Sequence, residues 1–182
     1  MEIKELENHL RNLDQTVLSL GQNIQNMRNS IAQCHLQADS LESQAQMLMS
    51  MASSEEDQVA AAQMCSQASV CMDQAHACRV QAESVQLQMD GMISELSGYK
   101  SEYQSYMSEG QTKLANLKIA ADQLTGMTGS TYGAAKIKEV LVVTKQRMVY
   151  NQNLISGCQK RITWIEQICG PSGDSYTKVR RR

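Results

Sequence analysis

The apolar residues of the first 48 positions recur at alternating steps of three and four. They fill every position of this pattern: Ile3, Leu6, Leu10, Leu13, Val17, Leu20, Ile24, Met27, Ile31, Cys34, Ala38, Leu41, Ala45 and Leu48. Such spacing keeps apolar side chains on one side of a slightly underwound helix, and it is the seam pattern of a coiled coil. The pattern therefore predicts a long helix over about residues 2–50.

A first turn is predicted at Met51–Ser54. Ser53 followed by Glu56 fits a capping box, in which hydroxyl and carboxylate satisfy early backbone N–H groups. The seam then continues over about residues 54–125, first through small Ala and Cys side chains and later through Leu, Met and Tyr. Two consecutive steps of four around Gly110 form a stutter, which locally unwinds a supercoil. Gly110 is therefore the expected position of a bend, and a break there would give four helices.

A third helix is predicted over about residues 134–169, between the glycine-rich segment 126–133 and Gly170-Pro171. Its seam is joined by a second apolar stripe, which indicates two neighbours. The fold prediction is therefore all-α: an elongated antiparallel coiled-coil assembly of three long helices, forming one domain over residues 1–170. Residues 171–182 are expected to form a flexible basic tail.

Composition and charge fit this picture and add one asymmetry. The chain has one Pro, no Phe and 4% aromatic residues, which is unusual for a compact mixed fold. Residues 1–133 carry 7 basic and 16 acidic side chains, whereas residues 134–182 carry 10 basic and 3 acidic ones. The basic segment could dock on the acidic one, or bind nucleic acid weakly through Lys178 and Arg180–Arg182.

No stretch of 18 apolar residues is present, and the N-terminus lacks a basic and apolar signal sequence. A cytoplasmic protein is expected, or one exported by a route without a Sec signal peptide. The six cysteines contain no CxxC pair and are interpreted as reduced, small hydrophobic residues. The alternative is a thiol- or metal-based sensor, built where helices meet from Cys34, His35, Cys71, His76 and Cys78. No cofactor is expected.

Apolar residues outside the seams are the candidate partner-binding residues. They comprise methionines at the first turn, aliphatic residues facing away from the seam of the second helix, and the second stripe of the third helix: Met47, Met49, Met51, Val59, Val70, Val80, Leu87, Tyr150, Leu154 and Trp164. The alternative for the methionines is that they fill gaps at the end of the hairpin. The alternative for the aliphatic residues of the second helix is that another helix covers them. Asn151 within the third seam is a candidate register-setting residue, expected near Tyr106.

Enzymatic motifs are not found: the sequence contains no nucleotide-binding glycine loop, HExxH, GxSxG or EF-hand loop. The prediction is therefore a non-enzymatic helical interaction protein, such as a scaffold, an adaptor or a secretion accessory. It would bind a protein, either itself or a helical partner, through apolar helix faces.

Overall fold

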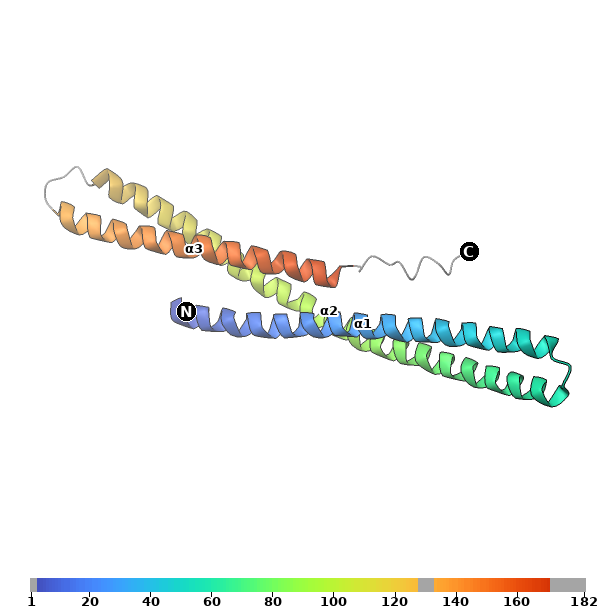
Figure 1. Cartoon of the computed structure of the whole chain (residues 1–182). Helices are drawn as coiled ribbons and strands as arrows, with labels where there is room; N and C mark the ends of the chain where they lie inside the picture. The colour runs from blue at the N-terminus through green and yellow to red at the C-terminus, as the bar shows by residue number, and fades with distance from the viewer. Residues whose placement is uncertain (1–2, 128–132, 171–182) are drawn as a thin grey trace. The chain divides into compact units, whose positions relative to one another are not determined.

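Three long helices make up the computed structural model, which describes residues 3–127 and 133–170 (Figure 1). Helix α1 spans Ile3–Ser54, α2 spans Gln58–Met127 and α3 spans Ala134–Cys169. No strand occurs within the described ranges. The prediction of an all-α fold of three long antiparallel helices is confirmed, and the predicted tail at 171–182 lies outside the described residues.

The helices group into two compact units, Met1–Ser94 and Glu95–Arg182. The N-terminal unit is a hairpin of α1 with α2 up to Ser94. The C-terminal unit is a hairpin of the remainder of α2 with α3 (Figure 1). The single domain expected over residues 1–170 stays a prediction.

The N-terminal unit has a narrow apolar core along the predicted seam. Ala38, Ala45 and Ala68 are fully buried, and Ala75 and Ala82 are almost so. Every predicted seam position of α1 from Leu6 onward is buried or half-buried. Small side chains let two helix axes approach closely, so alanine at these positions favours a tight hairpin. The 3-4 periodicity therefore identified the buried face correctly.

The first turn lies four residues later than predicted. Ala52 continues the seam and is buried, which keeps α1 helical to Ser54. The Ser53 hydroxyl donates to the Ser50 carbonyl at 2.7 Å, so Ser53 ends α1 and does not cap α2. The cap is Asp57, whose carboxylate accepts from the Val59 N–H at 2.9 Å and whose carbonyl accepts from the Ala61 N–H at 2.9 Å.

Helix α2 is helical throughout its 70 residues, so the alternative of a fourth helix is wrong. Gly110 is buried, and a β-carbon there would lie 3.2 Å from Ile155 Cγ1 and 3.4 Å from Leu154 Cδ2. Glycine at this position therefore allows α2 and α3 to pack closely. Its role is a close helix contact and not a helix break.

The core of the C-terminal unit contains two polar residues on α3. The Thr144 hydroxyl donates to the Val140 carbonyl at 2.8 Å, and the Asn151 amide donates to the Arg147 carbonyl at 2.8 Å. Both side chains are buried. Each buried side chain thus donates a hydrogen bond to a backbone carbonyl one turn earlier in its own helix. The register-setting role of Asn151 stays a prediction.

Tyr106, expected near Asn151, has Cys158 as a neighbour. Burial raises the pKa of its phenol, and the charges of Glu102, Glu109 and Cys158 raise it further. Two ion pairs lie on the surface of the described part of this unit. Lys100 of α2 contacts Glu166 of α3 at 2.6 Å, and Glu109 contacts Lys113 at 2.6 Å within α2.

Candidate interaction surfaces

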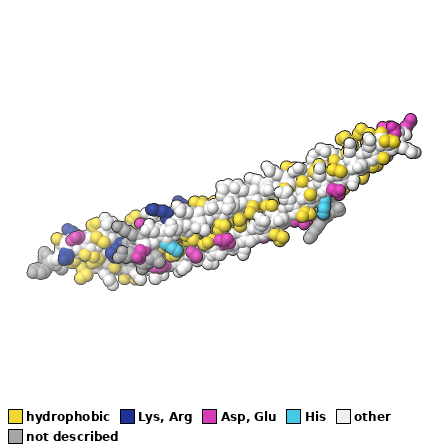
Figure 2. Space-filling model, turned by 90° about the horizontal axis from the view of Figure 1, so that it is seen from below, with side chains coloured by type: hydrophobic (Ala, Val, Ile, Leu, Met, Phe, Trp, Pro, Cys, Tyr) yellow, Lys and Arg dark blue, Asp and Glu magenta, His cyan; other side chains and the backbone are white. Residues whose placement is uncertain are grey.

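The end of the N-terminal hairpin, called the tip below, exposes the candidate residues Met47, Met49, Met51 and Val59. Their exposed fractions are between 49% and 67%. The acidic residues 55–57 of the connecting turn are also exposed, and Figure 2 shows acidic side chains beside hydrophobic ones at this end. All four side chains are exposed, so they do not fill gaps within the hairpin, and their role in binding a partner stays a prediction. Flexible thioethers make adaptable contact surfaces.

The outward face of α2 in the N-terminal unit is apolar at three further candidate positions. Val70, Val80 and Leu87 are 51%, 50% and 74% exposed. They point away from the seam because they fall between its buried positions, such as Ala75 and Ala82, on the helical repeat. Cover by another helix, the alternative interpretation, is not observed within the N-terminal unit.

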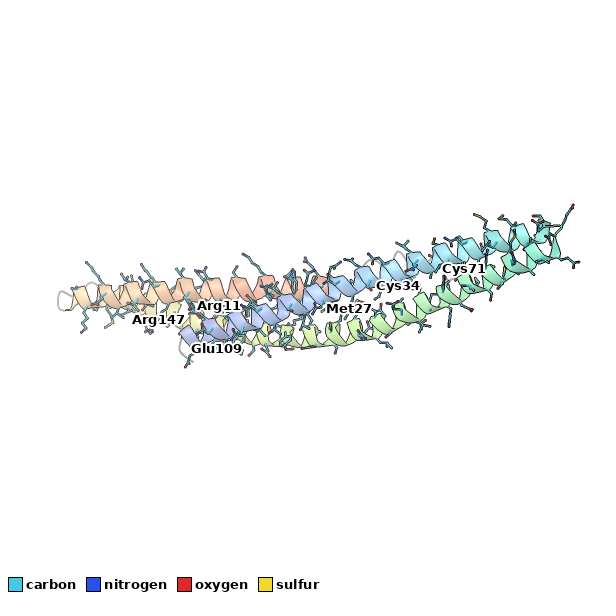
Figure 3. The ribbon with its side chains drawn as sticks, turned by 60° about the horizontal axis from the view of Figure 1, so that its bottom comes forward. Arg11, Met27, Cys34, Cys71, Glu109 and Arg147 are labelled. Atoms are coloured by element: carbon cyan, nitrogen blue, oxygen red, sulfur yellow. The ribbon has the colours of Figure 1, made fainter. Side chains whose placement is uncertain are left out.

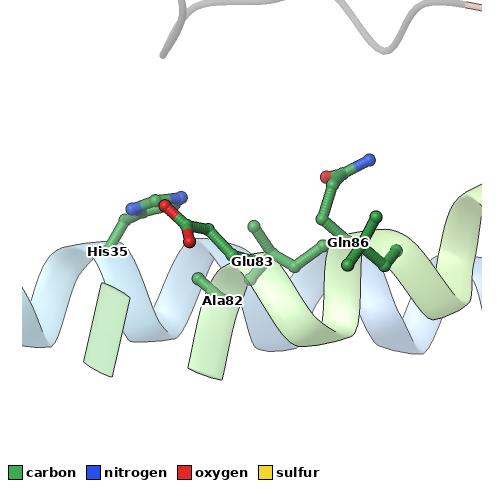
Figure 4. A pocket seen from close by; sticks show the side chains of 6 residues that line it. His35, Ala82, Glu83 and Gln86 are labelled. Atoms are coloured by element: carbon green, nitrogen blue, oxygen red, sulfur yellow. The ribbon is translucent and has the colours of Figure 1, made fainter. Parts of the chain in front are cut away.

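A shallow groove on the N-terminal hairpin is lined by side chains from both α1 and α2. It has a volume of about 370 Å³ and is lined by Ile31 and His35 of α1 and by Ala82, Glu83, Gln86 and Leu87 of α2. His35, Glu83 and Gln86 project on the same side of the two helices (Figure 4). The groove is open to solvent and joins apolar walls to one carboxylate, one imidazole and one amide. It can accept a side chain from a neighbouring helix.

Arg79 joins the two helices of the N-terminal hairpin, which the sequence did not reveal. Its guanidinium contacts Glu42 Oε1 at 2.6 Å and Asp39 Oδ1 at 3.2 Å. The Arg79 side chain is only 18% exposed, so its stem packs against the hairpin while its head reaches two carboxylates. These two contacts link α1 to α2 by charge in addition to the apolar seam.

The six cysteines are spread along the three described helices. All six are free thiols, with Cys34 and Cys158 buried and Cys65 exposed. Cys34 and Cys71 lie at different levels along the hairpin (Figure 3). Within residues 3–127 and 133–170, no group of three or more His, Cys, Asp or Glu side chains is placed to hold a metal ion. The geometry gives the predicted sensor alternative no support.

The candidates on α3 are less accessible than those on α2. Tyr150, Leu154 and Trp164 are all half-buried. Leu154 faces Gly110 across the hairpin, so part of its surface is covered within the chain. The Arg161 guanidinium lies 5.5 Å from the centre of the Trp164 ring, a cation–π contact that covers the indole face. Part of the surface of these three residues is therefore covered within the C-terminal hairpin.

Other apolar residues of α3 are exposed instead. Val140 and Val143 are exposed at 46% and 43%. Val142 and Val149, which were not among the candidate residues, are 54% and 55% exposed. The signal that marks them is their 3-4 spacing with Lys138 and Lys145, which places apolar and basic residues on one helix face.

None of the described helices has a segment long and apolar enough to cross a membrane. No known protein family, curated protein or solved structure matches this chain. The candidate surfaces therefore stand on their own geometry.

Proposed function

We propose that this chain is a non-enzymatic interaction protein that binds another protein through the exposed apolar face of its N-terminal hairpin. The observation that carries the proposal is the exposure of Leu87 at 74%, beside an open groove and in line with Val80. A leucine exposed to this extent gains free energy when a partner covers it, about 1.5–3 kcal/mol for full burial. Further exposed apolar side chains, those of Met47, Met49 and Met51, lie at the tip of the same hairpin.

The test is photo-crosslinking in the native host. A photoreactive amino acid is placed at Leu87 in one variant and at Met47 in another, with Asn23, an exposed polar position on α1, as the matched control. A protein adduct is expected from Leu87 and Met47 and not from Asn23. Adducts of equal yield from all three positions, or from none, would contradict the proposal.

A further inference from the structure

One face of α2 in the N-terminal unit alternates apolar and acidic residues. Val80, Glu83, Leu87 and Asp90, called the acidic stripe, are spaced by three, four and three residues, and all four are exposed. At 3.6 residues per turn this spacing places them within one narrow face of the helix. Asp90 Oδ1 accepts a hydrogen bond from Gln86 Nε2 at 2.8 Å, which leaves its other carboxylate oxygen unused by that bond.

One face of α3 in the C-terminal unit has the complementary pattern. Lys138, Val142, Lys145 and Val149, called the basic stripe, are spaced by four, three and four residues and are all exposed. Among the ion pairs between described residues, none involves either lysine of this stripe or either carboxylate of the acidic stripe. Both stripes therefore present unneutralised charge between exposed aliphatic side chains.

The charge of the two units has the same complementarity. Residues 1–94 carry 12 acidic and 4 basic side chains, a net charge of −8, whereas residues 95–182 carry 7 acidic and 13 basic ones, a net charge of +6. Two N-terminal units repel each other, and so do two C-terminal units. Electrostatic complementarity thus favours contact between unlike units and suppresses contact between like ones.

The two stripes also match in register when the helices run antiparallel. Val80 then faces Val149 and Leu87 faces Val142, because each pair is separated by seven residues, about 10.5 Å of helix. In the same register Glu83 falls beside Lys145 and Asp90 beside Lys138, each within one residue of the exact level. A single alignment therefore makes two apolar contacts and two ion pairs.

We propose that the acidic stripe of one chain binds the basic stripe of a second copy in this antiparallel alignment. The proposal rests on the proposed function and names its partner. Each copy carries both stripes, so the contact joins unlike surfaces and can be repeated. Such a contact closes into a small ring or extends into an open chain.

The contact is short and should be weak. Each stripe covers ten or eleven residue rises, about 15–17 Å of helix, which is small beside the roughly 800 Å² per partner of a standard interface. Exposed ion pairs are screened by salt, with a screening length of about 8 Å at 0.15 M. Self-association is therefore expected to depend on concentration and to fall as salt rises.

The experiment is sedimentation equilibrium of the full chain across concentration at low and high salt. The wild type should increase in average mass with concentration at low salt. Glu83→Lys with Asp90→Lys, and separately Lys138→Glu with Lys145→Glu, should each weaken association about tenfold or more, because two exposed attractions of 0.2–1 kcal/mol each become repulsions. Circular dichroism checks that every variant remains helical.

Mixing the two charge-reversed variants gives the decisive result. Neither can bind itself, but the reversed α2 of one matches the reversed α3 of the other, so association should return in the mixture. The control pairs keep the same charge changes away from the stripes: Glu55→Lys with Glu56→Lys, and Lys118→Glu with Lys136→Glu, all at exposed positions. Both control pairs should associate nearly as the wild type does.

Three outcomes would overturn the proposal. One is a wild type that stays monomeric at all concentrations and salts, as pairing of the stripes within one chain would give. Another is a mixture of charge-reversed variants that does not associate. The third is a Leu87 photo-crosslink only to a different protein, such as one with a basic helix, which rejects the second copy as partner while leaving the proposed function intact. Absence of any crosslink would reject the proposed function itself.

Discussion

Replacing Gly110 with alanine tests the close packing of α2 against α3 at this residue. Alanine in a helix interior is about 0.5–1 kcal/mol more favourable than glycine, because the unfolded glycine chain has more conformational freedom. At Gly110, however, the new β-carbon would lie 3.2 Å from Ile155 Cγ1 and 3.4 Å from Leu154 Cδ2. Those side chains must then yield by a few tenths of an ångström.

The two effects can be weighed. Adding a methyl group to a tightly packed core costs about 1–3 kcal/mol, which exceeds the gain in helix propensity. Gly110→Ala should therefore lower the free energy of unfolding, by about 1 kcal/mol as the middle of the combined range. Such a change lowers Tm by about 2–4 °C in a chain of this size.

Gly98 and Gly157 provide the matched controls in the same unit, because a β-carbon at either position meets nothing within 4 Å. Alanine at these positions should raise the free energy of unfolding by about 0.5–1 kcal/mol each. Urea unfolding followed by circular dichroism measures all three variants. If Gly110→Ala stabilised the chain as much as Gly98→Ala does, the close approach at Gly110 would be refuted.

Three further changes test individual contacts. Asp57→Ala removes the cap of α2 and should lower the free energy of unfolding in urea by about 1 kcal/mol. Ser53→Ala should change it by less than about 0.5 kcal/mol. Equal effects of the two substitutions would contradict the assignment of Asp57 as the cap. Arg79→Met keeps the apolar stem but breaks the interhelical ion pair. It should lower the free energy of unfolding by about 1 kcal/mol, and by less at high salt. A loss of stability that salt does not change would indicate that Arg79 stabilises the hairpin by packing instead. The hydrogen bond and charge of Lys113 lower the pKa of Glu109. The ion pair therefore stabilises the folded chain above the pKa that the carboxyl has in the unfolded chain, and this stabilisation is lost as pH falls through the pKa of Glu109 in the folded chain. Carboxyl NMR titration should find a higher Glu109 pKa in Lys113→Gln, and an unchanged pKa would reject the pairing.

The periodicity of the chain was sufficient to predict the buried face of each helix. An apolar stripe at 3-4 spacing can be buried only along one side, so residues such as Ala38 and Ala45 were placed correctly. The turn was misplaced because several residues in 53–57 can cap a helix, and local propensity does not rank them. Burial of Ala52, a tertiary effect, extended α1 and left Asp57 as the cap.

Helix periodicity also determined which surface residues could be predicted. Leu87 was identified because it lies opposite the seam of α2, and a helix that pairs through one face exposes the other. Arg79 was missed because its partner Asp39 is 40 positions away in sequence, and their contact depends on the register of the hairpin. Val142 and Val149 were not predicted, because the lysines between them interrupt the apolar pattern.

The cysteines differ in exposure to solvent, so their rates of reaction can report how often each hairpin opens. Each unit holds one thiol that is nearly inaccessible, Cys34 in the N-terminal unit and Cys158 in the C-terminal unit, while Cys65 is open to solvent. A buried thiol reacts with an alkylating reagent only when its surroundings open, so its rate relative to that of Cys65 reports the free energy of local opening. Mass spectrometry of the alkylated peptides would thus resolve how often each hairpin opens, in the unmodified sequence and without an added probe.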